Sequence, residues 1–91
     1  MRVQEIVLTP EVEDKVQRKH GLLPEEIRAV CLNPAQHLRK ARDGRYAIMG
    51  RTEAGRYVIV IGAYGGWGTL RIITARDMTS SERGLYERHL R

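Results

Sequence analysis

The sequence RYAIMGRT-EAG-RYVIVIGAY-GGWG-TLRIITARDMT, residues 45–79, contains three apolar runs separated by two short connections that carry glycine. The runs are rich in Ile, Val, Tyr and Thr, residues that suit the pleated, half-buried surface of a sheet. Connections this short are typical of hairpins, so the stretch predicts consecutive antiparallel strands at Arg45–Thr52, Arg56–Ala63 and Thr69–Arg76. The middle run, Tyr57–Ile61, lacks polar alternation, which indicates a central strand covered on both faces or paired on both sides.

The residues before this stretch predict a strand followed by a helix. Arg2–Leu8 is short and has the alternation of a strand. Thr9 and Pro10 suit the N-cap and the first position of a helix. This helix is predicted to continue to about His20 and to stop at Gly21, because glycine is favoured just after a helix.

A second helix is predicted to begin at Pro24, since proline is favoured in the first turn. Its buried stripe, at spacing i, i+3 and i+4, comprises Ile27, Val30 and Cys31. The helix should end at Asn33, because the residue before a proline is pushed out of the helical region. Gln36–Ala41 then predicts a short strand.

A further helix is predicted at Ser80–Leu90, because Thr79 and Glu82 have the capping-box spacing of a helix start. Arg42–Gly44 reads as a turn, so the predicted order is β-α-α-β-β-β-β-α. This order indicates an α+β fold, with two N-terminal helices packed on one face of a small, mostly antiparallel sheet. A length of 91 residues predicts a single domain over residues 1–91.

The composition narrows the class of protein. No apolar run approaches the ~20 residues that span a bilayer, and the N-terminus lacks the apolar region of a signal peptide. The single cysteine, Cys31, forms no internal disulfide, and a cytoplasmic protein is expected.

The net charge of +5 is unevenly distributed. Residues 1–35 hold five Lys/Arg and six Asp/Glu, a balance of −1, whereas residues 36–91 hold eleven and five, a balance of +6. A basic sheet favours a polyanionic partner such as RNA, DNA or an acidic protein. The alternative is an arginine-rich surface that is simply solvated.

Arginines gather near the ends of the predicted strands and suggest an anion-binding surface. They are Arg45, Arg51, Arg56, Arg71 and Arg76. Strict strand alternation would direct Arg71 and Arg76 to opposite faces of the sheet unless a bulge lies between them.

Several motifs in this order resemble the BrnT family of RelE-like ribonuclease toxins, from about His20 to Tyr86. The motifs are Lys19-His20-Gly21, Pro24-Glu25-Glu26-Ile27, Gly50-Arg51-Thr52-Glu53-x-Gly55-Arg56-Tyr57, the run from Arg71 to Thr79, and Glu82-Arg83. One pair of residues departs from the pattern: Leu8-Thr9 stands where BrnT chains often carry a Trp-Asp pair.

The resemblance implies a metal-independent endoribonuclease toxin of a type II toxin–antitoxin system. It would cleave RNA, inhibit translation, require no cofactor, and be neutralised by a ribbon-helix-helix antitoxin of the BrnA type. In such toxins the 2′-hydroxyl attacks the adjacent phosphate, while the protein stabilises charge and transfers protons. Arginine suits the first task because its planar fork binds phosphate oxygens and stays charged.

The candidate site consists of basic residues in these motifs. We expect catalytic roles for Arg51, Arg76 and His20, since the histidine pKa near 6.5 suits proton transfer. The candidate RNA-binding residues are Arg45, Arg56, Arg71 and Lys19.

Each catalytic candidate also has a structural interpretation. Arg76 could pair with Asp77 or another acid, and Arg51 could stabilise a turn. His20 lies on an apolar helix face beside the helix C-terminus, where a packed capping residue is common. Glu53 is either a base or a turn acid.

Other features are less specific. The three histidines lack metal-ligand spacing with carboxylates or Cys. Trp67, among glycines, could stack on a base, contact a partner or pack on its own hairpin, and Tyr86 could belong to the site or pack its helix. Two further functions remain open: a catalytically inactive binding module with the toxin fold, and a housekeeping subunit of a homo-oligomer.

Overall fold

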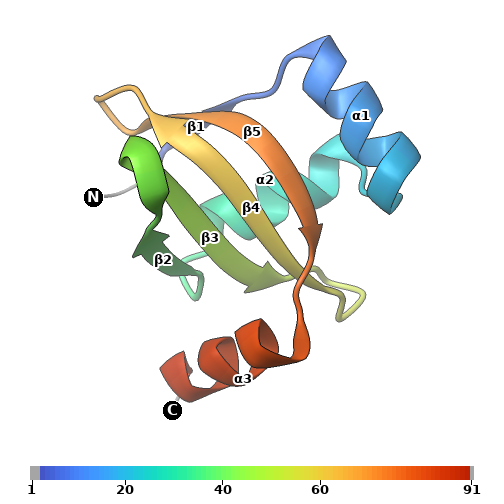
Figure 1. The fold of residues 1–91 in the computed structure, drawn as a ribbon, viewed down its shortest axis with the longest axis vertical. Helices are drawn as coiled ribbons and strands as arrows, with labels where there is room; N and C mark the ends of the chain where they lie inside the picture. Colours follow the sequence, from blue (N-terminus) through green and yellow to red (C-terminus); the bar gives the residue numbers. More distant parts are fainter. Residues whose placement is uncertain (1–2, 91) are drawn as a thin grey trace.

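The computed structural model describes residues 3–90, and these form five strands, three α-helices and one 3-10 turn (Figure 1). In chain order they are β1 (Glu5–Val7), α1 (Pro10–His20), α2 (Pro24–Leu32), β2 (His37–Lys40), η1 (Arg42–Gly44), β3 (Arg45–Arg51), β4 (Tyr57–Tyr64), β5 (Thr69–Asp77) and α3 (Ser80–His89). This is the predicted order of helices and strands. No helix in residues 3–90 is long and apolar enough to cross a membrane.

The strands form one mixed sheet in the order β1-β5-β4-β3-β2. The pairs β2–β3, β3–β4 and β4–β5 are antiparallel, and β1 joins β5 in parallel. β4 lies in the middle with a partner on each side, so the prediction that residues 57–61 form the central strand is confirmed.

Several predicted strand boundaries were wrong by one residue or more, and those at Arg56 and in the first strand have a clear physical reason. Arg56 was placed inside a strand, but it closes the β3–β4 turn: the Thr52 amide donates to the Arg56 carbonyl, and the Arg56 amide donates to the Thr52 hydroxyl. The first strand was predicted over Arg2–Leu8, but pairing is confined to Glu5–Val7, and Arg2 lies outside the described residues.

Helices α1 and α2 cover one face of the sheet and build the main core. α1 packs on β5, and α2 packs on β3 and β4. Thr9 caps α1 by accepting from the Val12 amide, and Gly21 ends it in the left-handed conformation at φ 63°. The largest fully buried side chains of this core include Leu22, Ile27, Val30, Ile48, Leu70 and Ile72.

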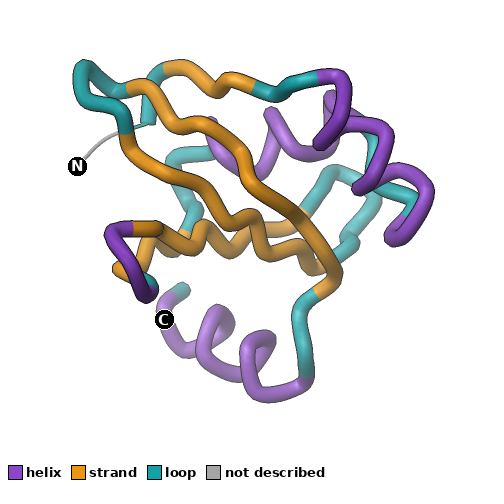
Figure 2. Tube along the Cα trace, turned by 45° about the horizontal axis from the view of Figure 1, so that its top comes forward, coloured by secondary structure: helices purple, strands orange, loops and turns teal. Residues whose placement is uncertain are grey.

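Helix α3 lies against the other face and covers only one end of it (Figures 1 and 2). A second, smaller core forms there, comprising Ala47, Met49, Ile59, Met78 and Tyr86. Thr79 and Glu82 form the predicted capping box at the start of α3. The rest of this face carries no helix, and we refer to it as the open face.

A bulge in β5 changes which side chains reach the open face. Ile61 pairs with Thr74 but the next residue, Gly62, pairs with Ile72, which leaves Ile73 without a partner. Glycine is required opposite the bulge, because a Cβ on Gly62 would lie 2.8 Å from the Leu70 Cγ atom and 2.9 Å from the Arg71 carbonyl oxygen.

The bulge overturns the expectation that Arg71 and Arg76 point to opposite faces. Ile72 and Ala75 are three residues apart, yet both are buried in the core beneath α1 and α2. Because side chains alternate on either side of the bulge, Arg71 and Arg76 both face away from that core. From α1, the Lys15 ammonium donates to the carbonyl oxygen of the unpaired Ile73 at 3.4 Å.

Candidate functional site

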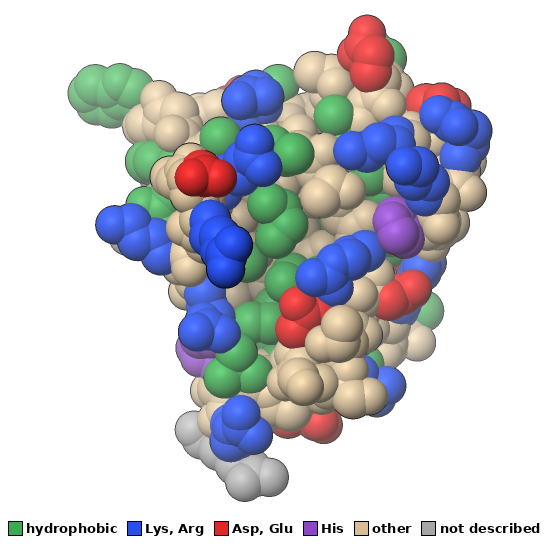
Figure 3. Space-filling view, viewed as in Figure 1, with side chains coloured by type: hydrophobic (Ala, Val, Ile, Leu, Met, Phe, Trp, Pro, Cys, Tyr) green, Lys and Arg blue, Asp and Glu red, His purple; other side chains and the backbone are tan. Residues whose placement is uncertain are grey.

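A groove of about 320 Å³ lies on the open face beside α3. Its floor is apolar and is formed by β3 and β4 through Ala47, Met49, Ile59 and Ile61. Its sides are Arg39 and Lys40 from β2, Arg76 from β5, and Glu82 and Leu85 from α3. Figure 3 shows Lys and Arg side chains bordering apolar surface on this face. A basic rim over an apolar floor suits a ligand with both phosphates and bases.

Two more arginines extend the basic rim away from α3. Arg45 and Arg71 are exposed, and both are paired with Ala63, one from each side. Alternation places Arg45 on the same face as Ala47 and Met49. With Arg39 and Arg76, they form the arginine row of the open face, which comprises Arg39, Arg45, Arg71 and Arg76.

Within this row Arg76 is held by a carboxylate. Its two terminal nitrogens donate to the two oxygens of Glu82 at 2.7 and 3.0 Å, and one of them also reaches the Asp77 carbonyl at 3.1 Å. The pKa of Glu82 is lowered to about 2, mainly by the hydrogen bonds from Arg76 and also by that from the Thr79 amide, against the opposing effect of burial. The ion pair considered as the alternative for Arg76 therefore exists, with Glu82 as the acid.

Arg56 is bound at the opposite side of the β5 end and does not line the groove. Its guanidinium donates to both oxygens of Asp77, at 2.6 and 3.0 Å, and to the carbonyls of His20 and Gly21 at the end of α1. The hydrogen bond from Arg56 lowers the pKa of Asp77. Arg56 thus satisfies carbonyls that the end of a helix leaves unpaired, and its donors are occupied by the protein itself.

Arg51 does not line the groove and is positioned by aromatic contact. Its guanidinium carbon lies 4.7 Å from the centre of the Tyr57 ring, and that of Arg83, from α3, lies 4.0 Å from the same ring. Tyr57 is fixed by an edge-to-face contact with Tyr86. Neither Arg51 nor Arg83 pairs with a carboxylate side chain in the described part of the chain. Arg83 was missed as a candidate, because its contact with the Tyr57 ring joins residues that are distant in the sequence.

The predicted proton-transfer residue lies elsewhere. His20 is half-buried at the C-terminal end of α1, where its backbone carbonyl accepts from Arg56 and its side chain is close enough to Asp77 to lower the pKa of that acid. Neither His20 nor the exposed Lys19 lines the groove. The structure therefore does not join His20 to Arg76 in one groove.

A different pair of histidines bridges β2 and the end of α3. The rings of His37 and His89 lie 4.0 Å apart between centres, tilted by 32°. Burial lowers the pKa of His37, and the nearby His89 and Arg39 lower it further. This contact was missed because it joins residues that are distant in the sequence.

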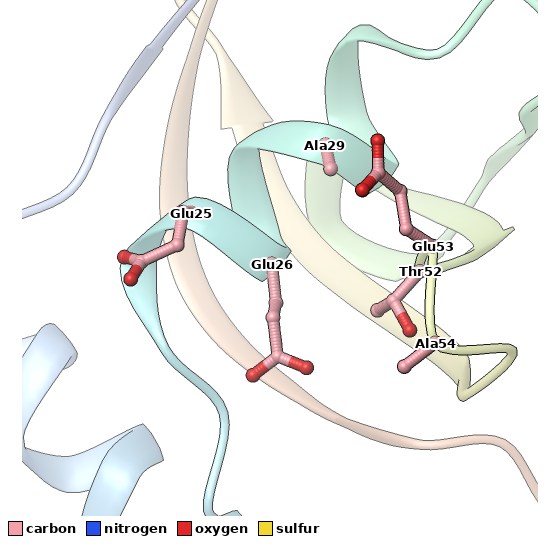
Figure 4. Close-up of a pocket in the computed structure, with 6 residues that line it drawn as sticks. All are labelled: Glu25, Glu26, Ala29, Thr52, Glu53 and Ala54. Carbon is pink, nitrogen blue, oxygen red and sulfur yellow. The ribbon is translucent and has the colours of Figure 1, made fainter.

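A second hollow, of about 400 Å³, has the opposite charge (Figure 4). Glu25 and Glu26 from α2 and Glu53 from the β3–β4 turn line it, although the carboxylate of Glu25 points away from the other two. A polyanion would be repelled, so the groove on the open face remains the better nucleic-acid interface. Within residues 3–90 no three or more His, Cys, Asp or Glu are grouped to hold a metal ion.

Comparison with known proteins identifies the family. The family model described as "Ribonuclease toxin, BrnT, of type II toxin-antitoxin system" matches residues 10–82. The crystal structure of the Brucella abortus ribonuclease toxin BrnT matches with a TM-score of 0.69 and 16% sequence identity, over 86% of this chain and 100% of that chain. That identity shows a shared fold only, and no curated protein sequence matches the chain. The family match over most of the chain shows that it belongs to the BrnT family of ribonuclease toxins of type II toxin–antitoxin systems.

Proposed function

We propose that this chain is a metal-independent endoribonuclease of the RelE-like superfamily that cleaves RNA and thereby inhibits translation. The observation that carries the proposal is the arginine row of the open face. The bulge in β5 brings Arg71 and Arg76 to the same side as Arg45 and the groove. Several cations along one face match the repeating charge of an RNA backbone.

The reaction divides between charge stabilisation and proton transfer. The 2′-hydroxyl of one nucleotide loses its proton and attacks the adjacent phosphorus. The bond from that phosphorus to the 5′-oxygen of the next nucleotide breaks, and the 5′-oxygen takes up a proton. Arg51 and Arg76 would stabilise the charge that develops on the phosphate oxygens. Arg45 and Arg71 would bind the RNA on the open face. His20, as the proton-transfer group, and Lys19 and Arg56, as RNA-binding groups, lie outside the groove, so they would have to act on a part of the RNA that extends beyond it.

The two arginines proposed as catalytic differ in whether a carboxylate already binds them. Arg51 has no carboxylate partner in residues 3–90 and is held in place by Tyr57, so its charge is available to a phosphate. Arg76 is bound by Glu82. A phosphate that enters the groove would therefore replace one carboxylate oxygen on Arg76 and move Glu82 aside.

Membership of a type II family implies an antitoxin partner. We propose that this partner is a ribbon-helix-helix protein of the BrnA type. Expression of the chain in a bacterial host should arrest growth, and co-expression with the antitoxin should restore it. Normal growth without the antitoxin would contradict the toxin role.

The direct test is RNA cleavage by purified protein in the presence of EDTA. Substrates are free single-stranded RNA and messenger RNA on translating ribosomes, since the proposal covers both. The Arg51→Ala and Arg76→Ala variants should each lose cleavage by roughly 10²-fold. RNA with a 2′-O-methyl group at the scissile position should bind and stay intact.

A matched control removes an arginine far from the groove. Arg18 on α1 is exposed and pairs only with Asp14, four residues before it, so Arg18→Ala should cleave at the wild-type rate. Cleavage that survives the combined Arg51→Ala and Arg76→Ala changes would overturn their roles. Cleavage abolished by EDTA would overturn metal independence.

A further inference from the structure

The turn between β4 and β5 carries the most exposed large hydrophobic side chain in residues 3–90. Trp67 is 96% exposed and is the only tryptophan of the chain. The turn, residues 65–68, projects from the end of the sheet opposite to α3 (Figure 1). The interpretation that Trp67 packs on its own hairpin is therefore wrong.

The backbone beneath this side chain is firmly held. The Gly65 amide donates to the Thr69 carbonyl at 2.9 Å, and the Gly68 amide donates to the Tyr64 hydroxyl at 2.8 Å. The Gly68 carbonyl accepts two amides from the segment entering β1, at 2.8 and 3.1 Å. The turn is therefore held by hydrogen bonds of its backbone, and the indole of Trp67 contributes nothing to the core.

Trp67 occupies a backbone conformation that disfavours it. Its φ is 56°, in the left-handed region, which costs a residue with a side chain roughly 1–2 kcal/mol relative to the right-handed form. Glycine would avoid that cost. Neither burial nor backbone preference favours tryptophan here, and its exposed indole is available for a contact outside the chain.

The surroundings of the indole suit a nucleobase. Its neighbours Gly65, Gly66 and Gly68 have no side chains that could cover either face of the ring. Just inside the turn stand Arg71 and Arg45, both exposed on the open face. An aromatic ring next to cations that follow a backbone is the arrangement that binds single-stranded nucleic acids.

We propose that Trp67 stacks on a base of a single-stranded RNA whose backbone passes over Arg71 and Arg45 toward the groove. This inference rests on the proposed function and adds a binding position outside the groove. β5 spans roughly 20 Å between Thr69 and Arg76 at the rise of an extended strand. A ligand that reaches both the groove and the turn must therefore contain several nucleotides.

The single tryptophan allows a direct measurement, because all tryptophan emission reports on this one side chain. The probe is an uncleavable 2′-O-methyl RNA of about ten nucleotides carrying a fluorescein label, whose anisotropy reports binding independently. Binding should quench the emission of Trp67. A dinucleotide should quench it much less, because it cannot span the groove and the turn together.

Three variants separate stacking from a structural role. Trp67→Ala should weaken binding by roughly 5- to 150-fold, as expected for one lost base stack, and Trp67→Phe should recover part of it. Trp67→Gly should bind as weakly as Trp67→Ala and yet be no less stable than wild type, because glycine accepts a positive φ. Leu32→Ala, which truncates a residue 44% exposed on α2, is the matched control and should bind normally.

Salt dependence distinguishes the stack from the cations beside it. The slope of log affinity against log salt is negative, and Arg71→Ala should make it less steep by about 0.7, the value for one phosphate contact on a single strand. Trp67→Ala should weaken binding at every salt concentration without changing the slope.

The outcomes separate the inference from the proposed function. RNA binding with unchanged emission, and with Trp67→Ala equal to wild type, would overturn the inference and leave the proposed function intact. Emission that responds only to the antitoxin would also overturn it, since Trp67 would then belong to a protein interface. No RNA binding by any form of the protein, on or off the ribosome, would count against the proposed function itself.

Discussion

Replacing Glu82 with glutamine tests how strongly the groove depends on its single internal ion pair. Glu82 accepts two hydrogen bonds from Arg76 and also serves the capping box of α3 through the Thr79 amide. Glutamine keeps an oxygen for the cap but has no charge. The Glu82→Gln change therefore removes the ion pair and leaves the helix start in place.

The expected loss of stability follows from the pKa of Glu82. A fall from the ordinary value of 4.5 to about 2 corresponds to a ceiling of roughly 3.4 kcal/mol. The Arg76 side chain is 39% exposed and that of Glu82 is 23% exposed, so water screens the pair. We expect a loss of about 1–2 kcal/mol, which lowers the Tm of a domain this size by roughly 5–15 °C.

The loss should depend on pH in a defined direction. Because the folded pKa is depressed, the stabilisation is present above the unfolded value near 4.5 and disappears as the pH falls toward 2. The difference in unfolding free energy between wild type and Glu82→Gln should thus be full at pH 7 and below half of that at pH 3. Urea unfolding followed by circular dichroism across this range measures it.

The control for this experiment is Glu87→Gln, which removes a carboxylate from the same helix. Glu87 is exposed and accepts one hydrogen bond, from the Tyr57 hydroxyl at 3.3 Å, so the expected change is below about 0.5 kcal/mol. A gap between wild type and Glu82→Gln that stays constant from pH 7 to pH 3 would refute the reasoning. Equal stability at pH 7 would do so as well.

Three further substitutions or measurements test other parts of the structure. Gly62→Ala should destabilise the fold by about 1–3 kcal/mol in urea unfolding, because its Cβ would lie within 3 Å of its neighbours; Gly65→Ala, with its nearest atom at 3.8 Å, should cost less. Arg56→Ala leaves Asp77 and the last carbonyls of α1 without donors, so it should cost about 1–3 kcal/mol and speed amide exchange at the end of α1; unchanged exchange would speak against the clamp. Burial raises the pKa of Cys31 to about 12, so a thiol reagent at pH 8 should modify it only at the rate of unfolding, and fast modification of the folded protein would contradict that burial.

Local signals in the sequence predicted the elements well. Thr9 and Pro10 at the start of α1, and Gly21 at its end, act within a few residues, so their effect can be read without the rest of the chain. The apolar run of β4 likewise predicted the central strand, and β4 is paired on both sides in the middle of the sheet.

The candidate site was less predictable because it depends on contacts across the fold. Arg56 meets Asp77, 21 residues later, and becomes part of a helix end rather than a free cation. The bulge depends on the space that Gly62 leaves for the neighbouring strand. The arginine clusters could be found in the sequence, but which arginines are free and which are already paired could not.

The bulge at Ile73 also acts as a phase shift along β5. The alternation of inward and outward side chains after the bulge is displaced by one position relative to the alternation before it. Two arginines five positions apart, which an even strand would separate, therefore lie on the same face. If β5 paired evenly, with Ile73 taking its own place in the ladder, one of the two arginines would turn toward α1 and α2. The positive face of the sheet could then be lost without any change to an arginine.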